Sequence, residues 1–230
     1  LGMNDAMFHL GLSYSDGDIV AQNHRLGFRW FKKAAEGGHT RAQFWLGCAY
    51  DDGEGVKRDR KMALRWFLEA AECGDRDAEV SVGFVYHEGL GTRKNFKKAV
   101  YWYRKAAGQG HAGAQRNLGY ALRDGLGVKQ DVKEAVGWFR KAAEQGDSDA
   151  QLALGYALHE GKGVRKNFKE AVKWYRLSAK AGGATAQWNL ALCYRDGEGV
   201  PKSARWELYW LREAAESGNK DAEKAVRQLS

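Results

Sequence analysis

The sequence predicts an all-α fold, a superhelical α/α solenoid built from helix–turn–helix repeats of 36 residues. Three observations support this prediction: a period without insertions, apolar residues at helical spacing within each period, and helix-capping residues that recur at one position of the period. We call the residues at one position of successive periods a column. The period is clearest for tryptophan, which recurs at Trp30, Trp66, Trp102, Trp138, Trp174 and Trp210. Self-similarity at a fixed period of this length is typical of stacked repeat arrays.

The first helix of each period is predicted from apolar residues that share one helical face. In the second period they are Ala42, Leu46, Ala49 and Tyr50, which have the spacing of a buried stripe. We expect Gly47, on the same face, to let the partner helix approach closely. A Gly-x-Gly turn ends the helix, because a glycine there can adopt the left-handed conformation that satisfies terminal carbonyls.

The second helix is predicted to begin at a capping residue. An Asn, Asp or Ser side chain can accept a hydrogen bond from the first turn of a helix. All six capping positions hold such a residue: Asn23, Asp59, Asn95, Asp131, Asn167 and Ser203. We expect this helix to bury Ala63, Trp66, Phe67, Ala70 and Ala71.

One hairpin cannot bury the apolar faces of both its helices, so neighbouring hairpins must stack. No linker interrupts the series. We therefore predict one domain over residues 1–230, with six helix pairs within residues 4–218. A lone, highly charged helix over residues 219–230 is expected to cap the stack.

The repeat motifs resemble a known family. The run Ala-Gln-x-x-Leu-Gly-x-x-Tyr-x-x-Gly-x-Gly-Val begins at Ala42, and the run Ala-x-x-Trp-Phe/Tyr-x-x-Ala-Ala-x-x-Gly begins at Ala63. Both are similar to the Sel-one-like repeat (SLR) family, an α/α solenoid group related to tetratricopeptide repeats. The resemblance covers essentially the whole chain and implies an adaptor that assembles protein complexes. It also implies a setting in bacterial signalling, export or host contact.

The tetratricopeptide-like geometry implied by this resemblance places the first helices along a concave surface, where a protein or peptide partner would bind. Several columns there vary while the framework repeats, although neutral drift and packing against the next unit produce the same variation. We expect aromatics to act as anchors, Arg to pair with acidic groups, and Asn to bond the partner backbone. The candidate residues are Phe44, Trp45, Phe84, His87, Arg116, Asn117, Tyr120, Arg123, Tyr156, His159, Trp188, Asn189 and Arg195.

The charge pattern leaves a second function open. The net charge is +8, and one column is entirely basic: Arg25, Lys61, Lys97, Lys133, Lys169 and Arg205. Such a ladder would suit nucleic acid or an anionic membrane surface. A parallel acidic column, which includes Asp52 and Glu88, favours a solvated face with internal ion pairs instead. Nucleic acid is therefore not the expected partner.

No enzyme, metal site or cofactor is predicted. The Gly-x-Gly turns follow helices and lack the strand and the Lys-Ser/Thr that a phosphate loop requires. Histidines of the same column lie two repeats apart, too far to share a metal ion. Cys48, Cys73 and Cys193 are expected to be reduced, buried thiols, with a Cys48–Cys73 bridge as the alternative.

The compartment is left open. The odd cysteine count favours a reducing compartment, whereas removal of an upstream signal peptide would be consistent with export. No apolar run approaches the length needed to span a membrane. The partner's identity and the oligomeric state do not follow from the sequence.

Overall fold

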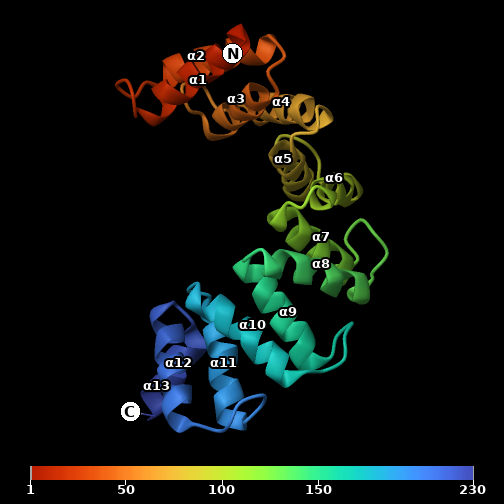
Figure 1. Cartoon of the computed structure of the whole chain (residues 1–230), viewed down its shortest axis with the longest axis vertical. Helices are drawn as coiled ribbons and strands as arrows, with labels where there is room; N and C mark the ends of the chain where they lie inside the picture. Colours follow the sequence, from red (N-terminus) through yellow and green to blue (C-terminus); the bar gives the residue numbers. More distant parts are fainter. Residues whose placement is uncertain (1, 230) are drawn as a thin grey trace. The chain divides into compact units, whose positions relative to one another are not determined.

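The computed structural model describes residues 2–229, and this part of the chain forms thirteen α-helices and no strand (Figure 1). Their bounds are α1 Met3–Asp16, α2 His24–Glu36, α3 Thr40–Asp52, α4 Arg60–Glu72, α5 Arg76–Glu88, α6 Phe96–Gly108, α7 Ala112–Asp124, α8 Val132–Glu144, α9 Ser148–Glu160, α10 Phe168–Lys180, α11 Ala184–Asp196, α12 Ala204–Glu216 and α13 Lys220–Leu229. The predicted alternation of two helices per 36 residues is confirmed.

The helices form two compact units. One comprises α1 to α6 together with the turn residues Leu126–Val128, and the other comprises α7 to α13. Within each unit every helix packs on the next in sequence, first within a hairpin and then between hairpins. The single uninterrupted domain stays a prediction.

The capping column is confirmed. The Asn95 side-chain oxygen accepts a hydrogen bond from the Lys98 amide at 3.0 Å, and the Asp131 oxygen accepts one from the Glu134 amide at 2.8 Å. The first turn glycine also behaves as expected. Gly53 adopts a φ of +82°, and its amide donates to the carbonyl of Ala49.

In five of the six hairpins, a glycine on the first helix lets an aromatic ring of the same hairpin approach its backbone. A Cβ added at Gly47 would lie 2.5 Å from the ring of Phe67, so only glycine fits. The same pairing recurs at Gly11–Phe31, Gly83–Tyr103, Gly119–Phe139 and Gly155–Tyr175. In the sixth hairpin Ala191 replaces the glycine and Leu211 replaces the ring. The methyl group of Ala191 thus occurs together with a leucine, which is smaller than an aromatic ring.

The second glycine of the turn joins one hairpin to the hairpin before it. A Cβ at Gly91 would lie 2.7 Å from the carbonyl of Arg60, and one at Gly163 would lie 2.6 Å from that of Val132. Each turn therefore rests on the first residues of the preceding second helix. This contact brings the middle residue of the turn, Lys162 in the fifth hairpin, beside the packing interface between hairpins.

The expected burial of tryptophan is wrong for Trp66, which is half-buried, whereas its neighbour Phe67 is 4% exposed. In the first five hairpins the ring that touches the glycine is buried. The expected burial of tryptophan does hold for Trp102 and Trp210, which are each 8% exposed. The indoles lie beside the ring that touches the glycine, and several are covered by a cation such as Lys141, whose Nζ is 4.1 Å from the Trp138 centroid. The aliphatic part of such a Lys or Arg side chain shields the aromatic surface from water, while its charged group stays hydrated.

All three cysteines are free, so the alternative Cys48–Cys73 bridge is not formed. Only Cys193 is buried, Cys48 is half-buried, and Cys73 is exposed, so the expectation of buried thiols is wrong for Cys73. Burial raises the pKa of both Cys48 and Cys193 to about 12, which keeps these thiols protonated. None of the helices described here is long and apolar enough to cross a membrane.

Candidate functional site

The candidate residues of the first unit lie on α3 and α5. Phe44 and Trp45 are half-buried: the Phe44 ring lies 5.9 Å from that of Phe67, and the Trp45 indole stacks on Phe31 at 5.9 Å and 19°. Phe84 is 49% exposed. His87 contacts the Glu88 carboxylate at 2.9 Å. Phe44 and Trp45 therefore help pack the hairpins, and Phe84 presents its ring to solvent.

In the second unit, Arg116 joins two hairpins. Its Nη1 lies 3.1 Å from Asp147 and 3.2 Å from Asp149 at the start of α9, while its Nε donates to the side-chain oxygen of Asn117. Tyr120, one turn further along α7, packs edge-on against Phe139 at 5.1 Å. These contacts occupy Arg116 and Tyr120 within the repeat stack.

Arg123 and Arg195 each hold the acidic residue that follows them. The Nε and Nη2 of Arg123 donate to both oxygens of Asp124 at 2.7 and 2.8 Å, and Arg195 binds Asp196 in the same way at 2.9 Å. These hydrogen bonds hold the pKa of the Asp124 and Asp196 carboxyls below its ordinary value. The acidic column is thus paired largely within its own helix. Among the turn lysines, Lys94 does reach Glu88, at 3.8 Å.

His159 lies between two carboxylates. Its Nδ1 is 2.9 Å from Glu160, and its Nε2 is 2.7 Å from Glu198 in the turn after α11. Tyr156, one turn earlier on α9, is 44% exposed, and its hydroxyl accepts a hydrogen bond from Lys162 at 2.9 Å. Trp188 and Asn189 are half-buried on α11.

Several of these side chains line open hollows between the first helices of successive hairpins. We name each hollow after its two odd-numbered helices. The volumes are about 480 Å³ for the α1–α3 hollow, about 560 Å³ for the α7–α9 hollow and about 160 Å³ for the α9–α11 hollow. Tyr156 lines both the α7–α9 and the α9–α11 hollow.

The three hollows occupy the same positions of the repeat. Every lining residue of the α7–α9 hollow is the counterpart, three periods on, of a lining residue of the α1–α3 hollow. Phe139 thus corresponds to Phe31, and Tyr156 corresponds to Cys48. The α9–α11 hollow uses the same columns with few exceptions. The stacking of the hairpins therefore creates the hollow, and the local sequence decides its chemistry.

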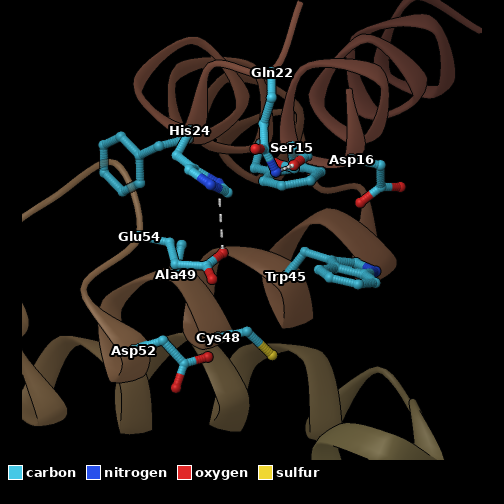
Figure 2. Close-up of a pocket in the computed structure, with 11 residues that line it drawn as sticks. Ser15, Asp16, Gln22, His24, Trp45, Cys48, Ala49, Asp52 and Glu54 are labelled. Carbon is cyan, nitrogen blue, oxygen red and sulfur yellow. Dashed lines mark hydrogen bonds and ion pairs between the residues drawn. The ribbon is translucent and has the colours of Figure 1, made fainter. Parts of the chain in front are cut away.

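The α1–α3 hollow is acidic. Its walls carry the carboxylates of Asp16, Asp52 and Glu54, with the Nδ1 of His24 3.7 Å from Glu54. Figure 2 shows His24 and Glu54 pointing toward one another, with Trp45 to one side of them. The α9–α11 hollow is acidic as well, since its lining includes Glu160, Asp196 and Glu198.

The α7–α9 hollow has a different character. Arg123 and Lys162 contribute two positive charges against the single carboxylate of Asp124, and the floor is apolar. The floor residues are Val132, Val136, Phe139, Ala153 and Ala157. Such surfaces can hold a partner's side chains by shape and charge.

Across residues 2–229, no group of three or more His, Cys, Asp or Glu side chains is placed to hold a metal ion.

The family follows from the repeat itself. A model of the Sel1 repeat matches six consecutive stretches, residues 4–39, 40–75, 76–111, 112–147, 148–183 and 184–219. The chain belongs to the Sel1 repeat family. Proteins built from Sel1 repeats generally mediate protein–protein interactions, on a scaffold that is generally not catalytic.

Solved structures of two bacterial proteins are similar throughout this Sel1 repeat chain. A protective antigen of uropathogenic Escherichia coli with an SLR fold is 36% identical over 98% of the chain, with a TM-score of 0.94. The chain spans about half of that protein, 48% of its length. A Sel1 repeat protein from Oxalobacter formigenes is 35% identical over 96% of this chain and 86% of its own, with a TM-score of 0.87.

An immunity protein from Pseudomonas aeruginosa shares the fold alone, at 20% identity over 96% of this chain and 84% of its own, with a TM-score of 0.53. No protein with a curated description matches the chain.

Sequence reasoning missed the turn residues that complete the hollows: Gln22, Glu54, Gln130, Lys162 and Glu198. A signal was present, because the middle residue of the Gly-x-Gly turn changes from Glu54 to Lys162 while both glycines stay. The sequence pattern does not specify how the hairpins stack. It therefore does not tell which side chains the middle residue of the turn faces.

Proposed function

We propose that this Sel1 repeat protein is a non-catalytic scaffold that binds a peptide or protein partner on the face formed by its odd-numbered helices. From the resemblance to tetratricopeptide-like stacks we infer that this is the concave face. The observation that supports the proposal best is the recurrence of open hollows at the same repeat positions, with linings that differ. Partner recognition requires such a combination of fixed geometry and variable chemistry. The relatives above are bacterial, and from the family resemblance we propose a setting in bacterial signalling or secretion.

The test begins with panning a displayed peptide library on the immobilised full chain. Selected peptides are then bound to a variant and to a matched control. Tyr156→Ala removes an exposed ring that lines two hollows, whereas Tyr101→Ala removes a ring that is 58% exposed on the even-numbered helix α6. We expect Tyr156→Ala to weaken binding about tenfold or more, as for an interface anchor, and Tyr101→Ala to leave it unchanged. Equal losses in both variants would place the binding surface elsewhere.

A Phe44→Ala, Trp45→Ala double variant is also expected to lose partner capture. Its interpretation needs a stability control, because Phe44 packs near Phe67 and Trp45 stacks on Phe31. Circular dichroism must show that helicity is retained. Tyr156, which is partly solvent-exposed, gives the cleaner comparison.

The basic column supports a second candidate, docking of a polyanion. The column comprises Arg25, Lys61, Lys97, Lys133, Lys169 and Arg205, all of which are exposed. Within the described residues, no ion pair involves any of these six side chains. Each follows the cap of a second helix, where the helix dipole disfavours positive charge. Filter binding of a nucleic-acid duplex across a salt series tests this candidate. A steep loss of affinity with increasing salt would support polyanion docking, and absence of binding at low salt would rule it out.

A further inference from the structure

The α7–α9 hollow lacks the aromatic side chain that covers the floor of the α1–α3 hollow. There, the Trp45 indole stacks on Phe31, with centroids 5.9 Å apart and planes 19° from parallel. The counterparts three periods on are Ala153 and Phe139, which both line the α7–α9 hollow. A methyl group therefore stands where the other hollow has an indole. This leaves open space over Ala153, next to Val132 and the exposed Tyr156 ring, for an aromatic ring from outside. The Phe139 ring itself is 2% exposed and packs against Tyr120.

The rim of the α7–α9 hollow differs in charge as well. In the α1–α3 hollow, His24 faces Glu54 at 3.7 Å. Their counterparts are Val132 and Lys162, so an apolar wall and a cation replace a polar pair. Lys162 lies with its Nζ 4.8 Å from the Tyr156 ring centroid and 2.9 Å from its hydroxyl. Arg123, the counterpart of Ser15, adds a second cation.

We propose that the α7–α9 hollow binds an aromatic side chain of the partner that has an acidic residue beside it in the partner's sequence. The ring packs over Val132 and Ala153 and against the exposed Tyr156 ring, in one of the geometries that aromatic pairs favour. The neighbouring carboxylate pairs with Lys162, because Arg123 already holds Asp124 and charge-assisted hydrogen bonds are strong. This inference rests on the proposed scaffold function and names the kind of segment that the scaffold recognises.

The other two hollows do not fit the same ligand. The α1–α3 hollow has its own indole on the floor and three carboxylates in its walls. The α9–α11 hollow is smaller, and His159 bridges Glu160 and Glu198 within it. Like charges repel an acidic ligand at both places. The selectivity for an acidic neighbour therefore belongs to the α7–α9 hollow.

The test uses substitutions that the chain itself carries at equivalent positions, so the variants are expected to fold. Ala153→Trp reproduces Trp45 and fills the hollow from within. Lys162→Glu reproduces Glu54 and Glu198 and reverses the charge of the rim. The probes are two acetylated, amidated peptides, Gly-Glu-Phe-Glu-Gly and Gly-Lys-Phe-Lys-Gly. Binding is followed as shifts of backbone amide signals in the full chain by NMR.

We expect the Glu-flanked peptide to shift the amide signals of Ala153, Ala157 and Lys162 in the wild type, and to bind more tightly than the Lys-flanked peptide. Ala153→Trp should abolish these shifts. Lys162→Glu should weaken binding of the Glu-flanked peptide by about threefold or more. This variant should bind the Lys-flanked peptide more tightly than the Glu-flanked one. Equal binding of both peptides, or unchanged binding by Ala153→Trp, would overturn the inference.

The failure of this inference and that of the scaffold function give different results. If signals on α3 or α11 respond while those of Ala153 and Lys162 do not, the assignment to the α7–α9 hollow is wrong and the scaffold function stands. If no odd-numbered helix responds to either peptide, and library panning yields no peptide that depends on Tyr156, both are wrong.

Discussion

The α1–α3 hollow and the α7–α9 hollow are built at the same repeat positions and yet offer a ligand different surfaces. Both have a buried phenylalanine, Phe31 or Phe139, pressed against a helix glycine. The first hollow covers this ring with Trp45 and surrounds it with carboxylates, whereas the second leaves it beside Ala153 and a rim that holds Lys162.

The comparison separates two kinds of position in the repeat. The glycine and the ring depend on each other, because a Cβ at Gly119 would lie 2.6 Å from Phe139, and the sixth hairpin replaces both together. The covering residue touches the hollow rather than the backbone of a neighbour, so it changes between repeats without changing the fold. Substitutions at the first kind of position should cost stability, and those at the second kind should change binding.

The largest effect is expected for the shared floor. Phe139→Ala removes a ring that is 2% exposed and should lower the free energy of unfolding by about 3–5 kcal/mol. Phe31→Ala, its counterpart, should cost a similar amount. Urea unfolding followed by circular dichroism measures both, with Tyr101→Ala as an exposed aromatic control. A loss no larger than that of the control would show that the floor is not structural.

A smaller effect is expected for the glycine that faces the ring. Gly119→Ala places a methyl group against Phe139 and should cost about 1–3 kcal/mol. The sixth hairpin carries the pair Ala191 and Leu211 instead. The double variant Gly119→Ala, Phe139→Leu should therefore be more stable than the two separate losses predict. Strict additivity of the two substitutions would contradict the contact.

Trp45 and Ala153 hold the same repeat position in the two hollows, so each can be exchanged for the other. Trp45→Ala removes a half-buried indole stacked on Phe31 and should cost about 1–3 kcal/mol. Ala153→Trp adds an indole in an open hollow, and its unfolding free energy should stay within about 1 kcal/mol of the wild type. Thermal unfolding of both variants checks this pair. A strongly destabilised Ala153→Trp protein would mean that the α7–α9 hollow is not open.

The smallest effect concerns the rim. The pKa of Asp124 is lowered in the folded protein, first by its hydrogen bonds from Arg123. Because the pKa of Asp124 is lower in the folded protein, its ionised carboxylate stabilises the fold at pH values above the ordinary pKa of 3.8. This contribution is lost as the pH falls through the pKa of the folded state. Because the pair is exposed, the amount is about 0.5 kcal/mol. Between pH 7 and pH 3, Arg123→Gln should lose less stability than the wild type, measured by urea unfolding. Identical pH profiles would show that the pair contributes nothing.

The repeat framework could be predicted from the sequence because its determinants are local. The cap at Asn95 and the left-handed glycine at Gly53 depend on a few neighbouring residues, and both behave as expected. The burial of Trp66 was not predictable in the same way, because the period does not tell which of two adjacent aromatics faces the glycine. Phe67 takes that place.

The candidate site could be predicted only in part. The variable columns of the first helices do line the hollows, as Trp45, Tyr156 and Asn189 show. The pairing of Arg123 with Asp124 was not foreseen, because successive helical residues do not normally face each other. Lys162 was missed because its approach to the hollow depends on how the turn rests on the preceding hairpin.

The most direct measurement opens the α1–α3 hollow. In Trp45→Ala, Phe31 loses its cover while Asp16, Asp52 and Glu54 stay in the walls. NMR titration of this variant should show the Lys-flanked phenylalanine peptide shifting amide signals of α3, while the Glu-flanked peptide does not. Absence of any response there, or a preference for the Glu-flanked peptide, would contradict the claim that repeat position makes the hollow and its lining selects the ligand.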